Sequence, residues 1–283
     1  MPVYHDYSLA PLSWFRTGGN ADLFMKADSL EELQTFMRNH SKGFNVLGNG
    51  SNTLVRDGGV REPVLKLGRG FRSVIKDGNR VTVGAACLNR TVVEQTCLWE
   101  LSGLEFLIGI PGSIGGAVAM NAGACGSETK DVLRLVQICL PSGDVQTVDA
   151  KSLNMTYRHA VLPEGAVIIS AVFELMSDDP VQIRQRINTY LEHRDSAQPI
   201  SGKTGGSTFK NPEGHKAWEL IDAVGLRGYQ IGGATFSEKH CNFIMNTDGS
   251  AADIEELGNL AQTRVREKMG IELEWEIKRI GQA

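Results

Sequence analysis

The chain has 283 residues, which is more than a single compact core usually holds and predicts two or three units. Hydrophobic residues make up 41% and charged residues 22%, as in a folded globular protein, so a disordered chain is a poor interpretation. The formal charge is 29 − 33 = −4 and no long basic run occurs, so nothing indicates a nucleic-acid partner.

The sequence also lacks the usual marks of export and of membrane insertion. No apolar stretch approaches the roughly 18 residues that span a bilayer. Residues 1–22 have neither the apolar core nor the cleavage pattern of a signal peptide. We therefore expect a cytoplasmic protein with reduced thiols and no metal centre. The five cysteines are widely spaced and form no CxxC pair: Cys87, Cys97, Cys125, Cys139 and Cys241.

The N-terminal part predicts an α+β unit. Residues 22–26 are typical of a strand, and Ser29 with Glu32 forms a capping box at the start of a helix. A short strand over 44–47 follows and leads directly into a glycine-rich turn. The helix face that we expect to be buried carries Leu30, Leu33, Phe36 and Met37.

The next part, from about residue 70, predicts strands around one helix. The helix covers 89–101, and a turn at 141–144 between two strands predicts a hairpin. The expected strands are 81–84, 133–140, 145–148 and 167–175. The inner face of the helix carries Val92, Val93, Thr96 and Cys97.

The C-terminal part predicts three helices and a final strand. The first helix begins at 177–180, and the second, 216–224, ends at Gly225. The third begins at Ser250 and ends at about Met269, before Gly270. Residues 271–280 alternate between apolar and charged side chains, which predicts one strand. The inner face of the first helix carries Ile183, Ile187, Tyr190 and Leu191.

Glycine is in excess, with 32 residues or about 11% against roughly 7% in average proteins. One cluster, Leu-Gly-Asn-Gly-Ser-Asn at 47–52, follows a strand and can expose backbone N–H groups as a nest for a phosphate. The dinucleotide-binding pattern G-x-G-x-x-G fails there, because Thr53 stands where the third glycine is required. A tight turn without a ligand explains the same residues, so the motif alone leaves both interpretations open.

A second cluster combines glycine with apolar residues and almost no charge. It runs from 109 to 116 and continues through 121–124. A surface loop would be more polar, whereas backbone without side chains suits a large ligand that carries a pyrophosphate and a flat ring. Close packing of a helix through small residues is the alternative.

Three side chains that could take part in catalysis stand in ordinary local contexts. Ser207 follows two glycines, where serine is most often a turn residue. Arg158 follows a tyrosine and would usually form a surface ion pair. Glu276 shares a strand face with two other glutamates, as on a solvated edge. None of them indicates a catalytic site alone, and the case depends on the motifs occurring together and in order.

The motifs do occur together, and they resemble those of the UDP-N-acetylenolpyruvoylglucosamine reductase (MurB) family. The compact region after Tyr157 and the short C-terminus resemble the shorter, type II branch. Six or more ordered motifs covering nearly the whole chain make a chance likeness a poor explanation. The matching segments are 14–21, 47–52 with Asp57, 103–106, 109–126, 157–158, 198–199, 206–212, 237–243 and 273–276.

The resemblance implies an α+β fold with a two-part FAD-binding region of the vanillyl-alcohol-oxidase-like (PCMH-type) fold. Residues 1–68 and 69–178 would form its two subdomains, and residues 179–283 a C-terminal α+β substrate-binding domain. The glycine clusters would then lie where the FAD pyrophosphate and ring rest. The residues expected to bind FAD are Gly48, Asn49, Gly50, Ser51, Asn52, Gly112, Ser113, Gly115, Gly116, Asn121 and Gly123.

The resemblance also implies an activity in peptidoglycan biosynthesis, and so in cell shape and division. NADPH would reduce non-covalent FAD, and hydride would pass to the β-carbon of UDP-N-acetylglucosamine enolpyruvate to give UDP-N-acetylmuramate. Arg158 would stabilise the enolate, with Glu276 assisting through a hydrogen bond or shared proton. Ser207 would protonate the α-carbon as general acid, provided that neighbouring charge lowers its pKa.

The same resemblance suggests Lys210 and Asn211 as substrate-binding residues and a monomeric enzyme whose partners are the UDP-sugar and NADPH. No separate NADPH motif occurs, which fits a single site that NADPH and the UDP-sugar occupy in turn. One departure from the family pattern is Trp275, which stands where proline or a polar residue is expected and would tilt the strand slightly just before Glu276.

Two other functions remain as alternatives. A related flavin oxidase would use oxygen on a sugar or alcohol and would need neither NADPH nor a protonating serine. A non-catalytic module for a nucleotide sugar would not need Arg158, Ser207 and Glu276 together. The motif after Gly205 favours the reductase over both.

Overall fold

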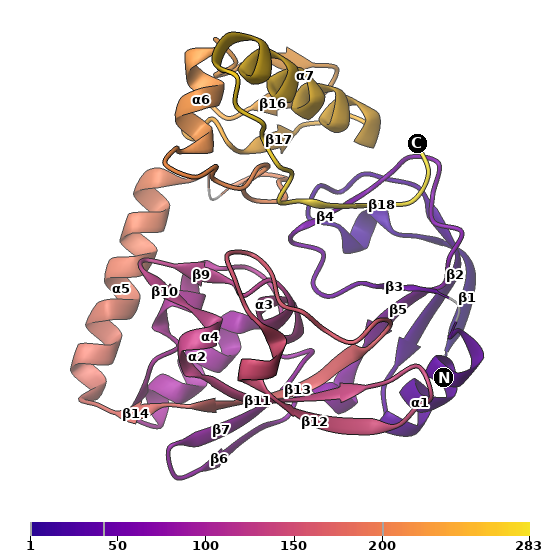
Figure 1. The fold of residues 1–283 in the computed structure, drawn as a ribbon, viewed down its shortest axis with the longest axis vertical. Coiled ribbons are helices and arrows are strands. Elements are labelled where there is room, and N and C mark those ends of the chain that lie inside the picture. Colours follow the sequence, from indigo (N-terminus) through magenta and orange to yellow (C-terminus); the bar gives the residue numbers. More distant parts are fainter. Residues whose placement is uncertain (1, 42, 200) are drawn as a thin grey trace. The chain divides into compact units, whose positions relative to one another are not determined.

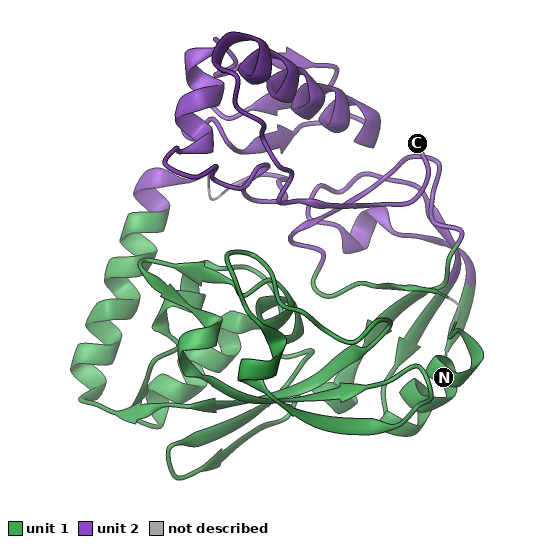
Figure 2. Cartoon of the chain, in the orientation of Figure 1, with its two compact units in different colours: residues 1–4, 24–49, 62–194 green, residues 5–23, 50–61, 195–283 purple. Residues whose placement is uncertain are grey.

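The computed structural model describes every residue except Met1, Lys42 and Ile200, and it divides the chain into two compact units (Figure 2). Unit 1 comprises residues 1–4, 24–49 and 62–194, and unit 2 comprises residues 5–23, 50–61 and 195–283. Within the part of the chain that is described, no helix is long and apolar enough to cross a membrane. The three-domain division of the sequence, with boundaries at 68 and 178, stays a prediction.

The N-terminal strands form a four-stranded sheet in the order β1-β2-β5-β3, with β2 and β3 both parallel to β5. Helix α1, Leu30–Asn39, buries three of its four predicted inner residues, but Leu30 is 41% exposed. Ser29 caps the helix as predicted, whereas the Glu32 carboxylate accepts from the amide of Asp28 instead of Ser29. The strands are β1 (Val3–Ser8), β2 (Asn20–Ala27), β3 (Asn45–Val46) and β5 (Val64–Leu67).

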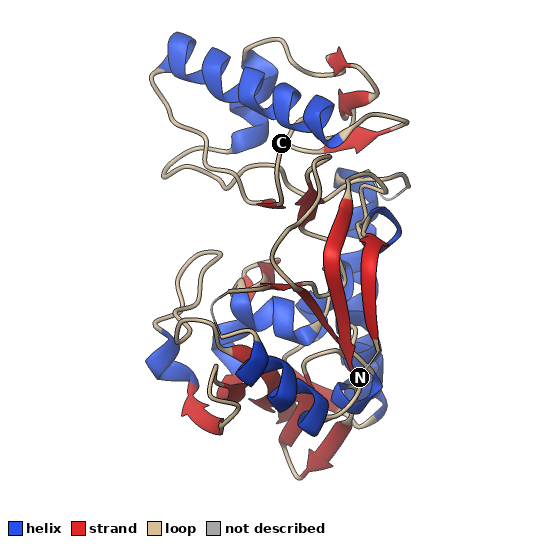
Figure 3. Ribbon diagram, turned by 90° about the vertical axis from the view of Figure 1, so that its right-hand side faces the viewer, coloured by secondary structure: helices blue, strands red, loops and turns tan. Residues whose placement is uncertain are grey.

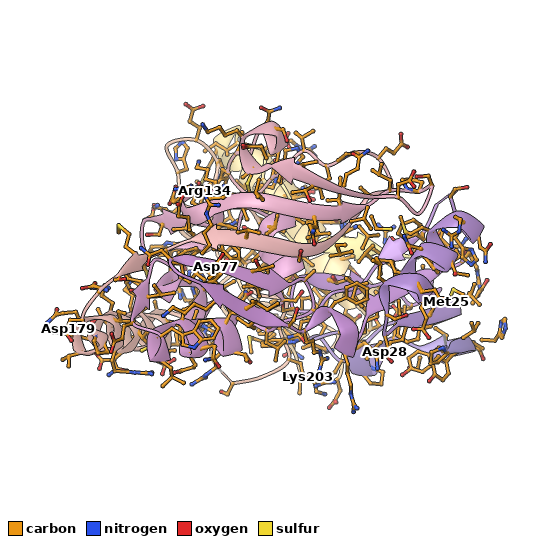
Figure 4. All side chains as sticks on the ribbon, turned by 90° about the horizontal axis from the view of Figure 1, so that it is seen from below. Met25, Asp28, Asp77, Arg134, Asp179 and Lys203 are labelled. Atoms are coloured by element: carbon orange, nitrogen blue, oxygen red, sulfur yellow. The ribbon has the colours of Figure 1, made fainter. Side chains whose placement is uncertain are left out.

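A five-stranded antiparallel sheet forms the centre of unit 1, in the order β12-β11-β13-β7-β6 (Figures 1 and 4). The predicted hairpin is confirmed, because β11 pairs with β12 from Leu135 opposite Asp149 to Cys139 opposite Val145. Arg134, labelled in Figure 4, joins β11 to β13 through an ion pair with Glu174 of 2.7 Å. The strands are β6 (Val74–Asp77), β7 (Arg80–Gly84), β11 (Leu133–Cys139), β12 (Val145–Asp149) and β13 (Val167–Glu174).

Helices cover one face of this sheet and close the core of unit 1 (Figure 1). Helix α2, Asn89–Leu98, buries all four residues predicted to face inward, but it ends before 101 because Glu100 has a positive φ of 58°. The glycine-rich segment forms a 3-10 helix, Glu105–Gly109, and then α3, Ile114–Ala119. The remaining elements are β8 (Leu101–Ser102), β9 (Gly123–Ala124), β10 (Ser127–Glu128), α4 (Thr129–Val132), β14 (Met176–Ser177) and α5 (Pro180–Ala197), with 3-10 helices at Arg69–Phe71 and Ala150–Leu153.

Unit 2 packs two helices on a three-stranded sheet of order β15-β16-β17 (Figure 3). Helix α7, Ala251–Met269, has the predicted start and stop: Ser250 and Asp253 form a capping box, and Gly270 has a φ of 70°. The buried core of unit 2 also includes Phe15 and Leu54 from the N-terminal part of the chain. The other elements are a 3-10 helix (Ala10–Leu12), β4 (Thr53–Val55), α6 (Ala217–Ala223), β15 (Gln230–Ile231), β16 (Ala234–Phe236), β17 (Ile244–Asn246) and β18 (Lys278–Ile280).

The predicted strand over 271–280 is wrong in extent. Only β18 forms, and it pairs in parallel with β4. Before β18, the segment meets residues 208–210 through single contacts and not through a continuous ladder, so the alternating pattern does not extend into a strand. Leu273 and Ile277 are nevertheless buried and Glu272 and Glu274 exposed, as the alternation predicts.

Candidate functional site

Two of the glycine clusters meet in unit 1. A Cβ built on the exposed Gly48 would lie 3.1 Å from the hydroxyl of Ser113, and one on the exposed Gly116 would lie 3.7 Å from the same atom. Ser113 is the N-cap of α3 and is 6% exposed, but its side chain makes no capping hydrogen bond. Glycine backbone from both clusters therefore lies beside a buried hydroxyl, as a close approach of FAD to the main chain would need.

The segment that carries this hydroxyl is fixed by the main chain and by Asn89. The Asn89 amide nitrogen donates to Gly112 O at 3.1 Å, and its Nδ2 donates to Ile110 O at 3.0 Å. Ile114 N–H binds Cys87 O and Gly115 N–H binds Ala85 O, both at 2.9 Å. These four hydrogen bonds fix the segment within unit 1. Asn89 is 1% exposed and was missed from the sequence, because an asparagine at a helix start carries no specific signal.

The first glycine cluster divides between the two units. In unit 1, Lys66 donates to Gly48 O, and burial, assisted by the charges of Arg72 and Lys26, lowers the pKa of Lys66 to about 8. In unit 2, Gly50 has a φ of 67° and a Cβ there would lie 2.0 Å from Leu12 O, so glycine is required. The Trp14 amide donates to Gly50 O at 3.0 Å. Asn49 and Ser51 lie half-buried in the same turn.

Arg158 lies in unit 1 at the tip of a tight turn. The turn is closed by hydrogen bonds of 2.9 and 3.2 Å between Thr156 and His159, and Arg158 has a φ of 55°. Its Nη2 donates to Gly123 O at 3.0 Å, and its guanidinium carbon lies 4.8 Å from the centroid of the Tyr157 ring. The half-buried guanidinium is therefore oriented from two sides and tied to the second glycine cluster.

Asn121 connects the same region internally. It is fully buried, and its Nδ2 donates to Glu128 Oε2 and to Thr156 O, each at 3.0 Å. Its Oδ1 accepts from the Lys130 amide at 3.0 Å. The Asn121 carboxamide is engaged in these three bonds and so orders the turn that carries Arg158. A contact between Asn121 and FAD would therefore involve its main chain.

The segments that carry Ser207 and Glu276 lie side by side in unit 2. The Glu276 amide donates to Thr208 O at 2.9 Å, and the Lys210 amide donates to Glu274 O at 2.8 Å. Asn52 Nδ2 donates to Glu276 O at 3.1 Å, which brings the end of the first glycine cluster to the same place. Ser207 and Glu276 are both half-buried.

Trp275 anchors the segment that carries Glu276. Its ring packs against Phe209 with centroids 5.1 Å apart at 55°, and its Nε1 donates to Gln262 at 3.1 Å. The indole lies on Gly258 of α7, where a Cβ would lie 2.2 Å from Cζ2. The departure from the family pattern at Trp275 is therefore accommodated by a glycine in the facing helix.

The two predicted substrate residues have protein partners in this structure. Lys210 Nζ forms an ion pair of 2.6 Å with the exposed Glu274. Asn211 Oδ1 accepts from the Ala217 amide at 3.0 Å, at the start of α6. The side chains of both residues are thus engaged with other parts of unit 2.

Comparison with known proteins identifies both parts of the chain. The family model described as UDP-N-acetylenolpyruvoylglucosamine reductase, C-terminal domain, matches residues 198–280, and that of an FAD binding domain matches 21–149. These matches confirm the predicted α+β fold class, with an FAD-binding region followed by a C-terminal domain.

Full-length relatives agree. UDP-N-acetylenolpyruvoylglucosamine reductases from Rickettsia peacockii and Granulibacter bethesdensis are each 46% identical, over 98% and 99% of this chain and 95% and 91% of their own length. The crystal structure of the MurB reductase from Thermus caldophilus superposes with a TM-score of 0.86 at 34% identity, covering 99% of this chain and 98% of that one. The chain therefore belongs to the UDP-N-acetylenolpyruvoylglucosamine reductase (MurB) family.

Proposed function

We propose that this protein reduces UDP-N-acetylglucosamine enolpyruvate to UDP-N-acetylmuramate in peptidoglycan biosynthesis, with NADPH as electron donor and FAD as cofactor. The observation that carries this proposal is the 46% identity over 98% of the chain to proteins named for that reduction. The flavin oxidase and the binding module lose their support, because the whole chain aligns with reductases. We also propose that the protein is a monomer, that it acts in the cytoplasm and that it has no nucleic-acid partner.

Gly48, Ser113 and Gly116 would hold FAD in unit 1, supported by the approach of Gly48 to the buried Ser113 hydroxyl at the start of the helix that contains Gly116. When bound, FAD supplies the hydride transfer from NADPH to the enolpyruvyl group. The remaining residues of both clusters would line the same cofactor: Asn49, Gly50, Ser51, Asn52, Gly112, Gly115, Asn121 and Gly123. Residues 1–68 and 69–178 then form the two FAD-binding subdomains, and residues 179–283 the substrate-binding domain.

The catalytic residues would stabilise the negative charge that develops on the substrate and deliver a proton to its α-carbon. Arg158, oriented by Gly123 O and the Tyr157 ring, would stabilise the negative charge that develops beside the substrate carboxylate. Ser207 would give its hydroxyl proton to the α-carbon and regain one from solvent. Glu276, on the segment hydrogen-bonded to Thr208, would share a proton with this group. Lys210 and Asn211 would bind the substrate.

The role of Ser207 is tested by following the two half-reactions separately. Ser207→Ala removes the proton donor, so we expect the flavin of this variant to be reduced by NADPH as in the wild type. We expect its reoxidation by the enolpyruvyl sugar to slow by about 100-fold or more. Ser201→Ala changes an exposed serine of the same unit and should leave both rates unchanged. Reoxidation of Ser207→Ala at the wild-type rate would remove Ser207 from the mechanism.

A further inference from the structure

The Asn242 side chain pairs with both main-chain groups of Phe209, two residues beyond Ser207. Asn242 Nδ2 donates to Phe209 O at 2.8 Å, and its Oδ1 accepts from the Phe209 amide at 3.0 Å. The side chain is 3% exposed. A carboxamide placed in this way supplies one donor and one acceptor, the two bonds that a neighbouring strand would supply.

The main chain around Asn242 extends the same contact. The Thr208 amide donates to Asn242 O at 2.7 Å, and Ser207 forms a single bridge with Phe243. Three consecutive residues, 207–209, are thus joined to 242–243 without a continuous strand pair on that side. The Asn242 carboxamide therefore makes the two hydrogen bonds to Phe209 that a neighbouring strand would otherwise make.

The two glycines that precede Ser207 differ in their surroundings. Gly205 is buried, and a Cβ built there would lie 2.4 Å from the Phe15 ring, whereas Gly206 has a φ of 83° with nothing within 4 Å of a Cβ built there. Glycine leaves the backbone its widest choice of conformations. The residue directly before Ser207 therefore does little to fix the direction of its hydroxyl, which depends on how the main chain of residues 207–209 is held.

We propose that Asn242 is a positioning residue that aims the Ser207 hydroxyl for proton delivery, acting through the main chain of residues 207–209. The inference rests on the proposed function, because it assumes that Ser207 is the proton donor. It places a specific task on the motif Ser237–Phe243, for which the sequence alone gave no role.

Asn246 provides a matched control in the same unit. It is 6% exposed and its carboxamide also makes two main-chain bonds, donating to Phe15 O at 2.8 Å and accepting from the Gly249 amide at 2.7 Å. It does not bond to residues 207–211 through its side chain. Replacing either asparagine by alanine removes two buried hydrogen bonds, but only Asn242→Ala removes them from the segment of Ser207.

The experiment compares Asn242→Ala and Asn246→Ala as FAD-loaded, full-length proteins. Both should melt at lower temperature than the wild type by similar amounts, and NADPH should reduce both at close to the wild-type rate. Reoxidation by the enolpyruvyl UDP-sugar should slow by about 100-fold in Asn242→Ala only, since a small displacement of a reacting group costs about that much. Equal reoxidation rates in the two variants would overturn the inference.

Coupling to Ser207 is the decisive readout. In a Ser207→Ala background, Asn242→Ala should slow reoxidation no further, because the group that it positions is already absent. A further loss as large as in the wild-type background would show that Asn242 acts independently of Ser207, and the inference would fail. Wild-type reoxidation by Ser207→Ala alone would instead reject the proton-donor role in the proposed function.

If Asn242→Ala does not fold, the variant Asn242→Asp and a measurement of amide hydrogen exchange test the same inference. Asp keeps the shape and the acceptor for Phe209 N–H but loses the donor to Phe209 O. It should show the same selective loss in reoxidation. Mass spectrometry should also find faster amide exchange in a peptide covering 205–212 for the Asn242 variant, with unchanged exchange there in Asn246→Ala. Unchanged exchange in both would contradict the proposed hold on this segment.

Discussion

Single polar side chains set the geometry around Ser207, and the half-buried His240 is one that we expect to respond to pH. Its ring lies edge-on to Phe243 with centroids 4.8 Å apart, and its Nδ1 accepts from the Asn242 amide at 3.3 Å. Burial lowers the pKa of His240 from its ordinary value of 6.5; a backbone hydrogen bond partly opposes this, and the charge of Arg227 adds a smaller lowering. The folded protein therefore holds this imidazole neutral, with Nδ1 available as an acceptor.

This shift predicts a loss of stability on mild acidification. The folded-state pKa is below the unfolded one, so the unfolded chain takes up the proton first as the pH falls through 6.5. The free energy of unfolding should fall from that pH downward, until the folded-state pKa is passed. Denaturant unfolding of His240→Asn, which keeps an acceptor, should show a flatter dependence between pH 7.5 and 5 than the wild type.

The exposed His5 gives the control, since His5→Asn should follow the wild-type curve. If the His240→Asn and wild-type curves run parallel over this range, the neutral imidazole is not a source of the pH dependence.

At the scale of elements, the contact between α7 and the segment before β18 depends on a missing side chain. Alanine at 258 would favour the helix by about 1 kcal/mol in isolation. Here, however, its Cβ would lie 2.2 Å from the Trp275 indole, which Phe209 and Gln262 hold from other sides. We expect Gly258→Ala to lower the free energy of unfolding by about 1–3 kcal/mol, as overpacking does.

A second substitution separates the overlap from other effects of alanine. Trp275→Leu removes the indole, so the double variant Gly258→Ala/Trp275→Leu should be no less stable than Trp275→Leu alone in chemical denaturation. A Gly258→Ala protein as stable as the wild type would mean that the indole shifts without cost, and the anchor for Glu276 would then be weaker than the contacts indicate.

Local signals in the sequence predict elements well where the cause is local. The capping box at Ser250 and the stop at Gly270 depend only on nearby residues, and both are confirmed. The strand expected over 271–280 fails because pairing depends on a distant partner, and only β4 provides one continuous enough. The hydrogen bond between Glu276 and Thr208, and those between Asn242 and Phe209, likewise depend on long-range contacts that periodicity does not encode.

At the scale of the whole molecule, each unit is built from segments that are far apart in the chain. Phe15 and Leu54 enter the core of unit 2 together with α6 and α7, although the sequence places them in the first predicted domain. No local pattern predicts such a grouping. The family and the activity were nevertheless predictable, because ordered motifs carry them independently of how the segments assemble, and the comparisons confirm the family.

The glycine clusters acquire meaning at this scale as well. Taken singly, each allowed a tight turn or close helix packing as an alternative to a ligand site. In the folded chain Gly48 lies beside the buried Ser113 hydroxyl at the start of α3, and Gly115 packs that helix closely against Ala85, so the second cluster also serves close helix packing. Their individual contacts with FAD remain a prediction.

The central claim is that the protein couples NADPH to an enolpyruvyl sugar through FAD, and an anaerobic titration of its visible spectrum tests this most directly. We predict a yellow protein that one equivalent of NADPH bleaches and that UDP-N-acetylglucosamine enolpyruvate then restores, with UDP-N-acetylmuramate as product. A protein that cannot be loaded with FAD, or one whose bleached form is restored by oxygen but not by the sugar, would contradict the claim.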